Sequence, residues 1–127
     1  MSKIIVNGGQ KLNGEMVIEG SKNAVLPILA ATVLNGGISV IKNCPKLKDV
    51  ESAIKILTQL GCKVKVEGKT ITVDSSTLHN TVVSEDLAAE MRSSIIFLGP
   101  ILARMGKVTI SYPGECVTIL AQKYGKE

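Results

Sequence analysis

Three side chains in this sequence could bind an anion or act as a nucleophile: Lys22, Arg92 and Cys116. Lys22 follows Ser21 and precedes an apolar run over 24–34, which predicts a helix with Ser21 as its N-cap. Free N–H groups and the positive end of the helix dipole favour an anion at such a start, and a lysine adds a full charge. The motif therefore indicates an anion site, with a solvated lysine as the ordinary alternative.

The other two candidates are less specific signals. Arg92 stands between Met91 and two serines in a segment with helical spacing, where it is either a surface cation or a bidentate clamp for phosphate. Cys116 falls in a predicted loop over 112–116, and exposed loop thiols are functional more often than core thiols. The only histidine is His79, so no neighbouring base in the sequence supports a catalytic cysteine.

Composition limits the class of protein. The chain has 127 residues, enough for one compact domain, and 45% of them are hydrophobic. Aromatic residues make up only 2%, and the net charge of +4 is spread over scattered single lysines and arginines. Nucleic-acid binding is therefore disfavoured, because base stacking has few side chains to use and no dense basic stripe is present.

The N-terminus and the cysteines predict a cytoplasmic protein without a metal or cofactor. The apolar run over 4–6 is too short for a signal sequence or a membrane span. Cys44, Cys62 and Cys116 lack the spacing of metal ligands. An odd number of dispersed cysteines is typical of free thiols in a reducing compartment, and we expect Cys44 and Cys62 to pack in the core.

Short strands and helices must position these residues. In the first part of the chain we expect strands over 3–7 and 15–19, a helix from Ser21 to about Leu34, and a strand over 38–42. The helix is apolar on nearly every side, which predicts burial on most faces. Gly36 follows it as a glycine C-cap.

The second part of the chain continues the alternation. Asp49 is predicted to cap a helix with one apolar stripe, which Gly61 closes, and residues 62–73 have the pattern of a hairpin. Ser84 is predicted to cap a further helix that Pro100 bends and Gly106 ends, before a strand over 107–111. Its expected buried face is formed by Leu87, Met91, Ile95, Leu98 and Leu102.

Several motifs together resemble the UDP-N-acetylglucosamine enolpyruvyl transferase family, in order and with matching spacing from about Lys3 to Cys116. Asn23 and Cys116 favour this family over its sister family, which acts on shikimate phosphate. The motifs are Gly20-Ser21-Lys22-Asn23-Ala24, Asn35-Gly36, Asp49-Val50, Met91-Arg92-Ser93-Ser94, Leu98-Gly99-Pro100-Ile101-Leu102-Ala103-Arg104 and Pro113-Gly114-Glu115-Cys116.

The resemblance implies an α/β fold: an inside-out α/β barrel of repeated βαβαββ units in two domains with the active site between them. This chain would supply one unit and the start of a second. Residues 1–19 would belong with the partner domain, and residues 20–127 would form part of a substrate-binding domain.

The resemblance also implies a reaction and its residues. The family moves the enolpyruvyl group of phosphoenolpyruvate to the 3-hydroxyl of UDP-N-acetylglucosamine, the first committed step of peptidoglycan synthesis, without a cofactor. Lys22 would bind phosphoenolpyruvate, Asn23 the UDP-sugar, and Arg92 a substrate phosphate. Cys116 would be the mobile-loop thiol that acts as acid or covalent nucleophile, and the target of fosfomycin.

The match ends sharply after Cys116. Where the family has an arginine, this chain has Ala121, or Gln122 if one residue is inserted, and it stops at Glu127. We therefore expect a truncated or frameshifted product that is inactive alone. The alternative is a non-catalytic, anion-binding remnant of the enzyme. We also expect exposed apolar surface to drive self-association.

Overall fold

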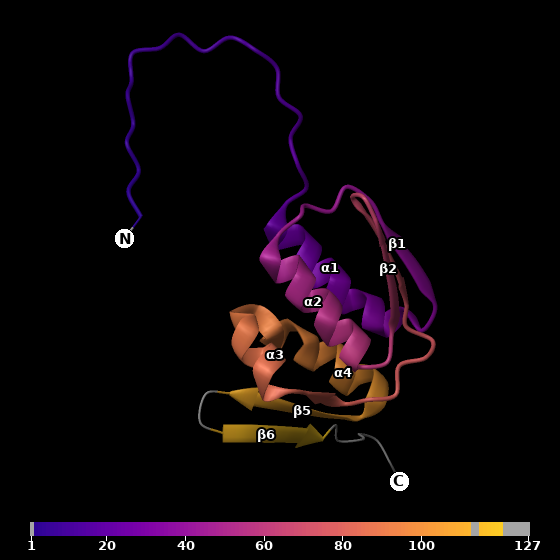
Figure 1. The fold of residues 1–127 in the computed structure, drawn as a ribbon. Coiled ribbons are helices and arrows are strands. Elements are labelled where there is room, and N and C mark those ends of the chain that lie inside the picture. Colours follow the sequence, from indigo (N-terminus) through magenta and orange to yellow (C-terminus); the bar gives the residue numbers. More distant parts are fainter. Residues whose placement is uncertain (1, 113–114, 121–127) are drawn as a thin grey trace.

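Two three-stranded sheets and the helices between them make up the body of the molecule (Figure 1). The computed structural model describes residues 2–112 and 115–120. The described elements follow the order α1, β1, α2, β2, β3, β4, α3, η1, α4, β5, β6. This is the predicted α/β alternation, with the strand expected before α1 missing from it.

The first helix forms where the sequence predicts it. Helix α1 spans Lys22–Asn35 and starts after Ser21, which has an extended backbone but makes no side-chain capping hydrogen bond. It ends at Gly36, whose φ of 67° lies in the left-handed region that glycine adopts without strain.

Helix α1 is buried on one face only, so the prediction of burial on most faces was wrong. The other face carries an apolar stripe at helical spacing, which we call the α1 stripe. Within it Ile28 is 48% exposed and Leu34 is 53% exposed. Every residue of the stripe is exposed. The stripe consists of Ala24, Pro27, Ile28, Ala31 and Leu34.

The first sheet follows α1 and is antiparallel throughout. Its order is β1 (Ile38–Ile41), β3 (Thr70–Asp74), β2 (Lys63–Glu67), with Val40 opposite Thr72 and Val64 opposite Val73. The β2–β3 pair is the predicted hairpin.

Helix α2 spans Lys48–Gln59, and its N-cap lies two residues before the predicted one. The N-cap is Leu47, so the prediction that Asp49 caps the helix was wrong; Asp49 lies in the first turn. Two of the predicted stripe residues, Ala53 and Leu57, are fully buried.

The third predicted helix is broken into three pieces: α3 (Glu85–Glu90), the 3₁₀ helix η1 (Arg92–Phe97) and α4 (Leu98–Met105). Ser84 caps α3 as predicted, accepting a hydrogen bond from the Leu87 amide at 3.4 Å. The break falls at Met91 and not at Pro100, because Met91 has an extended backbone that turns its side chain into the core.

The broken helix changes which side chains of this segment are buried. Ile95 is 41% exposed, contrary to the prediction, while Phe97 and Ile101 are fully buried. A 3₁₀ turn rotates successive residues by more than an α-helix does, so the 3.6-residue spacing no longer predicts the buried face.

The second sheet has the order β4 (Val82–Val83), β5 (Lys107–Tyr112), β6 (Glu115–Leu120). Strand β4 runs parallel to β5, and β6 runs antiparallel to it. The sequence did not indicate β4, which is only two residues long.

Cys116 lies in β6 opposite Ser111, and Tyr112 of β5 pairs with Glu115 of β6, so the predicted loop over 112–116 was wrong for these three of its residues. The alternating segment after Cys116 has β-forming residues that pair along β5, which draws the cysteine into the strand. Residues 113 and 114, which complete the predicted loop, lie outside the described residues.

Residues 2–20 have no regular secondary structure and lead away from the body (Figure 1), so the strands predicted over 3–7 and 15–19 were wrong. A strand needs a neighbouring edge for its backbone groups, and this segment has none. Its apolar side chains are exposed, with Ile4 at 89% and Val17 at 87%. Among the described helices, none is long and apolar enough to cross a membrane.

Candidate functional site

The start of α1 is held against the connection between β1 and α2. Asn43, in that connection, has a positive φ of 58°. A Cβ added to Gly20 would overlap the carbonyl oxygen of Asn43 and would lie 3.2 Å from Pro45 Cδ. Only glycine therefore lets the backbone that enters α1 pass this close to Asn43.

Lys22 is the first residue of α1 and forms an ion pair. Its Nζ lies 2.7 Å from Asp49 Oδ2, and the two side chains are 52% and 30% exposed. Asn23 follows in the same turn and is exposed. A partly exposed pair of this kind stabilises the fold only modestly, so the lysine can exchange its partner for a bound anion.

A hollow of about 200 Å³ lies beside this helix start. Neither Lys22 nor Asn23 lines the hollow, but Ser21 and Ala24, which precede and follow them in the chain, do. Lys42 and Asn43 supply its polar side. The lining residues are Gly20, Ser21, Ala24, Val25, Ile28, Ile41, Lys42, Asn43, Cys44 and Pro45.

The other two predicted site residues lie on different elements. Arg92 is the first residue of η1, which contacts α1, and it does not lie inside a continuous helix as predicted. Cys116 lies in β6, and α3 and α4 stand between β5 and the α1–α2 pair (Figure 1). The side chains of Arg92 and Cys116 lie outside the described part of the structure. The fold thus places η1 against α1 and puts the strand of Cys116 beyond the helices.

Asp49 is the residue of this site whose role sequence reasoning missed. Asp49 was predicted to cap α2, whereas its carboxylate pairs with Lys22 across the interface between α1 and α2. The sequence did contain a signal that Asp49 could belong to the site, since Asp49-Val50 is one of the motifs shared with the family. Its ion-pair partner is 27 residues away in sequence, and only the packing of the two helices brings them together.

Arg104, at the end of the shared motif over 98–104, has a structural role. Its Nη1 donates to the carbonyl of Val33 at 2.9 Å and to the carbonyl of Ser75 at 2.6 Å. Ser75 is buried and accepts from the Gly36 amide at 3.1 Å through Oγ. Arg104 therefore ties α4 to the C-terminal end of α1 and to the end of β3, and supplies the positive charge that a helix C-terminus favours.

The two buried cysteines, Cys44 and Cys62, are unsuited to nucleophilic chemistry, and their predicted packing in the core is confirmed. Cys44 and Cys62 are free thiols with 3% and 5% exposure. Burial raises the pKa of both thiols; for Cys62, the positive charge of Arg104 lowers the pKa again in part. The thiolate is the reactive form, so both side chains stay protonated and inert.

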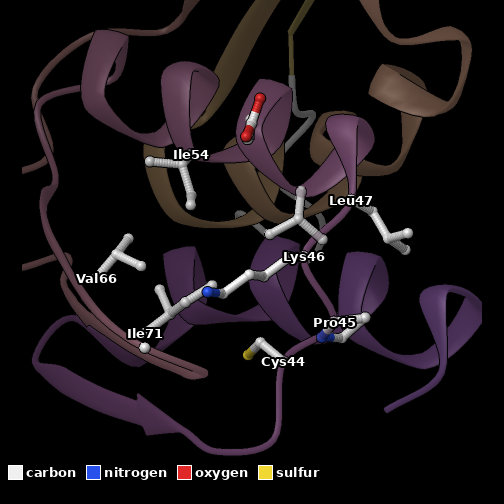
Figure 2. Close-up of a pocket in the computed structure, with 10 residues that line it drawn as sticks. Cys44, Pro45, Lys46, Leu47, Ile54, Val66 and Ile71 are labelled. Atoms are coloured by element: carbon white, nitrogen blue, oxygen red, sulfur yellow. The ribbon is translucent and has the colours of Figure 1, made fainter. Parts of the chain in front are cut away.

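A second pocket, which we call the α2 pocket, lies between α2 and the β2–β3 hairpin (Figure 2). Its volume is about 190 Å³. No residue predicted for substrate binding or catalysis lines it. Its lining residues are Cys44, Pro45, Lys46, Leu47, Val50, Glu51, Ile54, Val66, Gly68 and Ile71.

The chain is similar to known enolpyruvyl transferases. Residues 6–118 match the sequence profile of the family described as EPSP synthase (3-phosphoshikimate 1-carboxyvinyltransferase). The chain is 50% identical over 116 residues to UDP-N-acetylglucosamine 1-carboxyvinyltransferase 2 of Caldanaerobacter subterraneus, which covers 91% of this chain and 28% of that protein. It is 47% identical over 119 residues to UDP-N-acetylglucosamine 1-carboxyvinyltransferase 1 of Symbiobacterium thermophilum, covering 90% and 27%.

The fold resembles a solved structure of the same kind. The enolpyruvyl transferase NikO from Streptomyces tendae matches with a TM-score of 0.73 and 26% identity over 85% of this chain and 25% of that chain. The chain thus spans little more than a quarter of the length of these curated relatives and a quarter of the length of this solved structure.

Proposed function

This chain belongs to the EPSP synthase family, and from that premise we propose that it is the N-terminal part of a UDP-N-acetylglucosamine 1-carboxyvinyltransferase. The observation that carries the proposal is the 50% identity, over 91% of this chain, to a protein of that name. The reaction would join the 3-hydroxyl of UDP-N-acetylglucosamine to phosphoenolpyruvate and then release phosphate, as a step of peptidoglycan synthesis in the cytoplasm.

The start of α1 is the part of the proposed site that the described residues support best. Phosphoenolpyruvate carries a phosphate and a carboxylate, and Lys22 offers a half-exposed ammonium at a helix N-terminus beside a hollow. Asp49 would hold the ammonium in place until the substrate arrives. Asn23, in the same turn, has an amide that could both donate to and accept from the UDP-sugar.

Arg92 and Cys116 complete the proposal by family resemblance. Arg92 would contact a substrate phosphate from the first turn of η1. Cys116 would either donate a proton to the methylene carbon of phosphoenolpyruvate or, once that carbon is protonated, add as a thiolate to the adjacent carbon that bears the phosphate; it would also be the residue that fosfomycin alkylates. The described residues of this chain are a small share of the relatives' length, so we propose that turnover needs the remainder of such a protein.

A chimera tests the enzyme proposal. Residues 6–118 of this chain would replace the matching segment of the Caldanaerobacter relative, and phosphate release from phosphoenolpyruvate would be measured with UDP-N-acetylglucosamine or shikimate 3-phosphate as acceptor. We expect turnover with the UDP-sugar, loss of turnover in Lys22→Gln, and little change in Lys55→Gln, whose ion pair with Glu90 lies elsewhere. Turnover with shikimate 3-phosphate alone would contradict the proposal.

The alternative function is a non-catalytic, anion-binding remnant of the enzyme. The same chimera distinguishes this alternative from the enzyme proposal. The 127-residue chain would bind phosphate at Lys22 in both cases. Only the remnant reading predicts that the chimera binds phosphoenolpyruvate without releasing phosphate from it.

The domain proposal concerns residues 1–19, which we assign to the partner domain of a longer protein. Its support is that residues 2–20 expose apolar side chains and carry no regular structure of their own. Deleting residues 2–18 should leave the free energy of unfolding of the remaining chain within about 0.5 kcal/mol, because few contacts are lost. A loss of several kcal/mol would show that the segment packs on this domain.

Self-association of the chain is the last part of the proposal. The α1 stripe presents apolar side chains along a whole helix, and uncovered apolar surface of this kind drives association. Sedimentation velocity over a concentration series should show a reversible increase in mass, which Ile28→Lys should reduce. The matched control is Ile95→Lys, another exposed isoleucine outside the stripe. A concentration-independent monomer would contradict this part.

A further inference from the structure

The α2 pocket has apolar walls from three separate segments. Leu47, Val50 and Ile54 come from α2 and its N-cap, and Val66 and Ile71 come from the hairpin. Cys44 contributes a buried thiol whose pKa is raised by burial, so the wall it forms is uncharged. Such a surface favours an aliphatic or single-ring group over water.

Lys46 gives the pocket a positive charge. Figure 2 shows its side chain extending across the pocket toward Val66 and Ile71. Lys22, Lys55, Lys65 and Lys69 each lie within 4.0 Å of a carboxylate, whereas Lys46 has no carboxylate partner among the described residues. Its ammonium is therefore available to a ligand.

We propose that the α2 pocket binds a small apolar monocarboxylate, with its hydrocarbon part against the pocket walls and its carboxylate on Lys46. A lysine at such a site places its apolar stem along the pocket wall and its ammonium toward water. An amphiphilic anion can therefore contact the stem with its hydrocarbon part and the ammonium with its carboxylate. Glu51 also lines the pocket and selects by repulsion against ligands with a second negative group, such as phosphoenolpyruvate. The pocket thus differs in its preferred ligand from the site at Lys22.

The test is an NMR titration of the 127-residue chain with hexanoate, hexanamide and hexylammonium at equal ionic strength. Hexanoate should shift the amides of residues 44–47 and 66–71 and bind more tightly than the neutral amide. Hexylammonium should bind most weakly, because it meets Lys46 with a like charge.

Variants assign the binding to the pocket. Lys46→Gln should weaken hexanoate about threefold, toward the affinity of the amide, as expected for one exposed ion pair. Lys48→Gln is the control, since Lys48 is an exposed lysine two residues away that lines neither described pocket. Val66→Asp should abolish hexanoate binding, and Val40→Asp, at a similarly exposed strand position outside the pocket, should not.

The proposal is overturned if hexanamide binds as tightly as hexanoate, if Lys46→Gln leaves hexanoate affinity unchanged, or if hexylammonium binds best. Hexanoate shifts confined to residues 20–25 would also overturn it, because they would place the carboxylate at the start of α1. None of these outcomes bears on turnover by the chimera.

Discussion

Lys22 and Asp49 form an ion pair of 2.7 Å that joins the first turns of α1 and α2. The two residues come from different predicted helices, and their contact places a carboxylate beside the lysine proposed to bind phosphoenolpyruvate. An anion that binds Lys22 must compete with Asp49. Asp49 therefore sets how readily this end of α1 accepts a negatively charged ligand.

The first prediction concerns this competition. Asp49→Asn should strengthen phosphate binding about threefold, because it removes a carboxylate from the lysine without changing the shape of the side chain. Phosphate should then shift the amides of residues 21–24 in an NMR titration, and Lys22→Gln should abolish those shifts. Glu51→Gln, which removes a charge from the same helix turn but not from Lys22, is the control. Equal affinity in Asp49→Asn and the unmodified chain would argue against the site.

The second prediction concerns Gly20. Gly20→Ala should lower the free energy of unfolding by about 1–3 kcal/mol, because the new methyl group overlaps the carbonyl oxygen of Asn43 and forces the backbone to shift. Gly99→Ala is the matched control. Gly99 lies in α4 with open space around it, so alanine there should be neutral or stabilising by about 0.5–1 kcal/mol. Urea unfolding measures both changes, and similar midpoints for the two variants would contradict the close approach.

The third prediction concerns Arg104. Arg104→Met keeps most of the hydrophobic stem and removes the hydrogen bonds to the carbonyls of Val33 and Ser75, so stability should fall by about 2 kcal/mol. Lys107→Met, at an exposed position just beyond α4, should change stability by less than about 0.5 kcal/mol. Hydrogen exchange should show faster opening at the C-terminal turn of α1 in Arg104→Met. Unchanged exchange there would mean that the arginine does not tie the two helices.

The fourth prediction concerns the acid dependence of stability. The pKa of Asp74 is lowered because its Oδ1 accepts hydrogen bonds from the Ser76 hydroxyl at 2.6 Å and the Ser76 amide at 3.0 Å. The unfolded chain therefore binds a proton at this residue more readily than the folded chain does, and stability falls as the pH drops below the unfolded pKa. Urea midpoints between pH 7 and pH 2 should fall less steeply in Asp74→Asn.

The control for this prediction is Glu67→Gln, which removes a carboxylate from the same hairpin. Glu67 forms an ion pair of 2.7 Å with the exposed Lys65. In Glu67→Gln the urea midpoint should fall with decreasing pH as steeply as it does in the unmodified chain. If Asp74→Asn and the unmodified chain lose stability in parallel on acidification, the hydrogen bonds of Ser76 do not stabilise the ionised form.

Elements whose signals are local in the chain could be predicted from residue types and spacing alone. Helices α1 and α2, the hairpin β2–β3 and strand β5 form where residue spacing, Gly36 and Gly61 predict them. A glycine that can adopt a positive φ and an apolar stripe at helical spacing act within a few residues of chain, so no knowledge of distant contacts was needed.

Features that depend on contacts between residues far apart in the chain could be seen only in the folded molecule. Residues 2–20 have β-forming sequence but no edge to pair with, and Cys116 lies in a strand because β5 offers one. The helix after Ser84 breaks at Met91 because the core takes that side chain.

The candidate site divides in the same way. Its lysine and asparagine could be identified from a motif of neighbouring residues. The ion pair of Lys22 with Asp49 and the hydrogen bond from Arg104 to the Val33 carbonyl in α1 could be identified only in the folded chain. Ion pairs and hydrogen bonds between elements depend on where helix axes cross. Crossing geometry is set by how the whole core packs, which no local pattern contains.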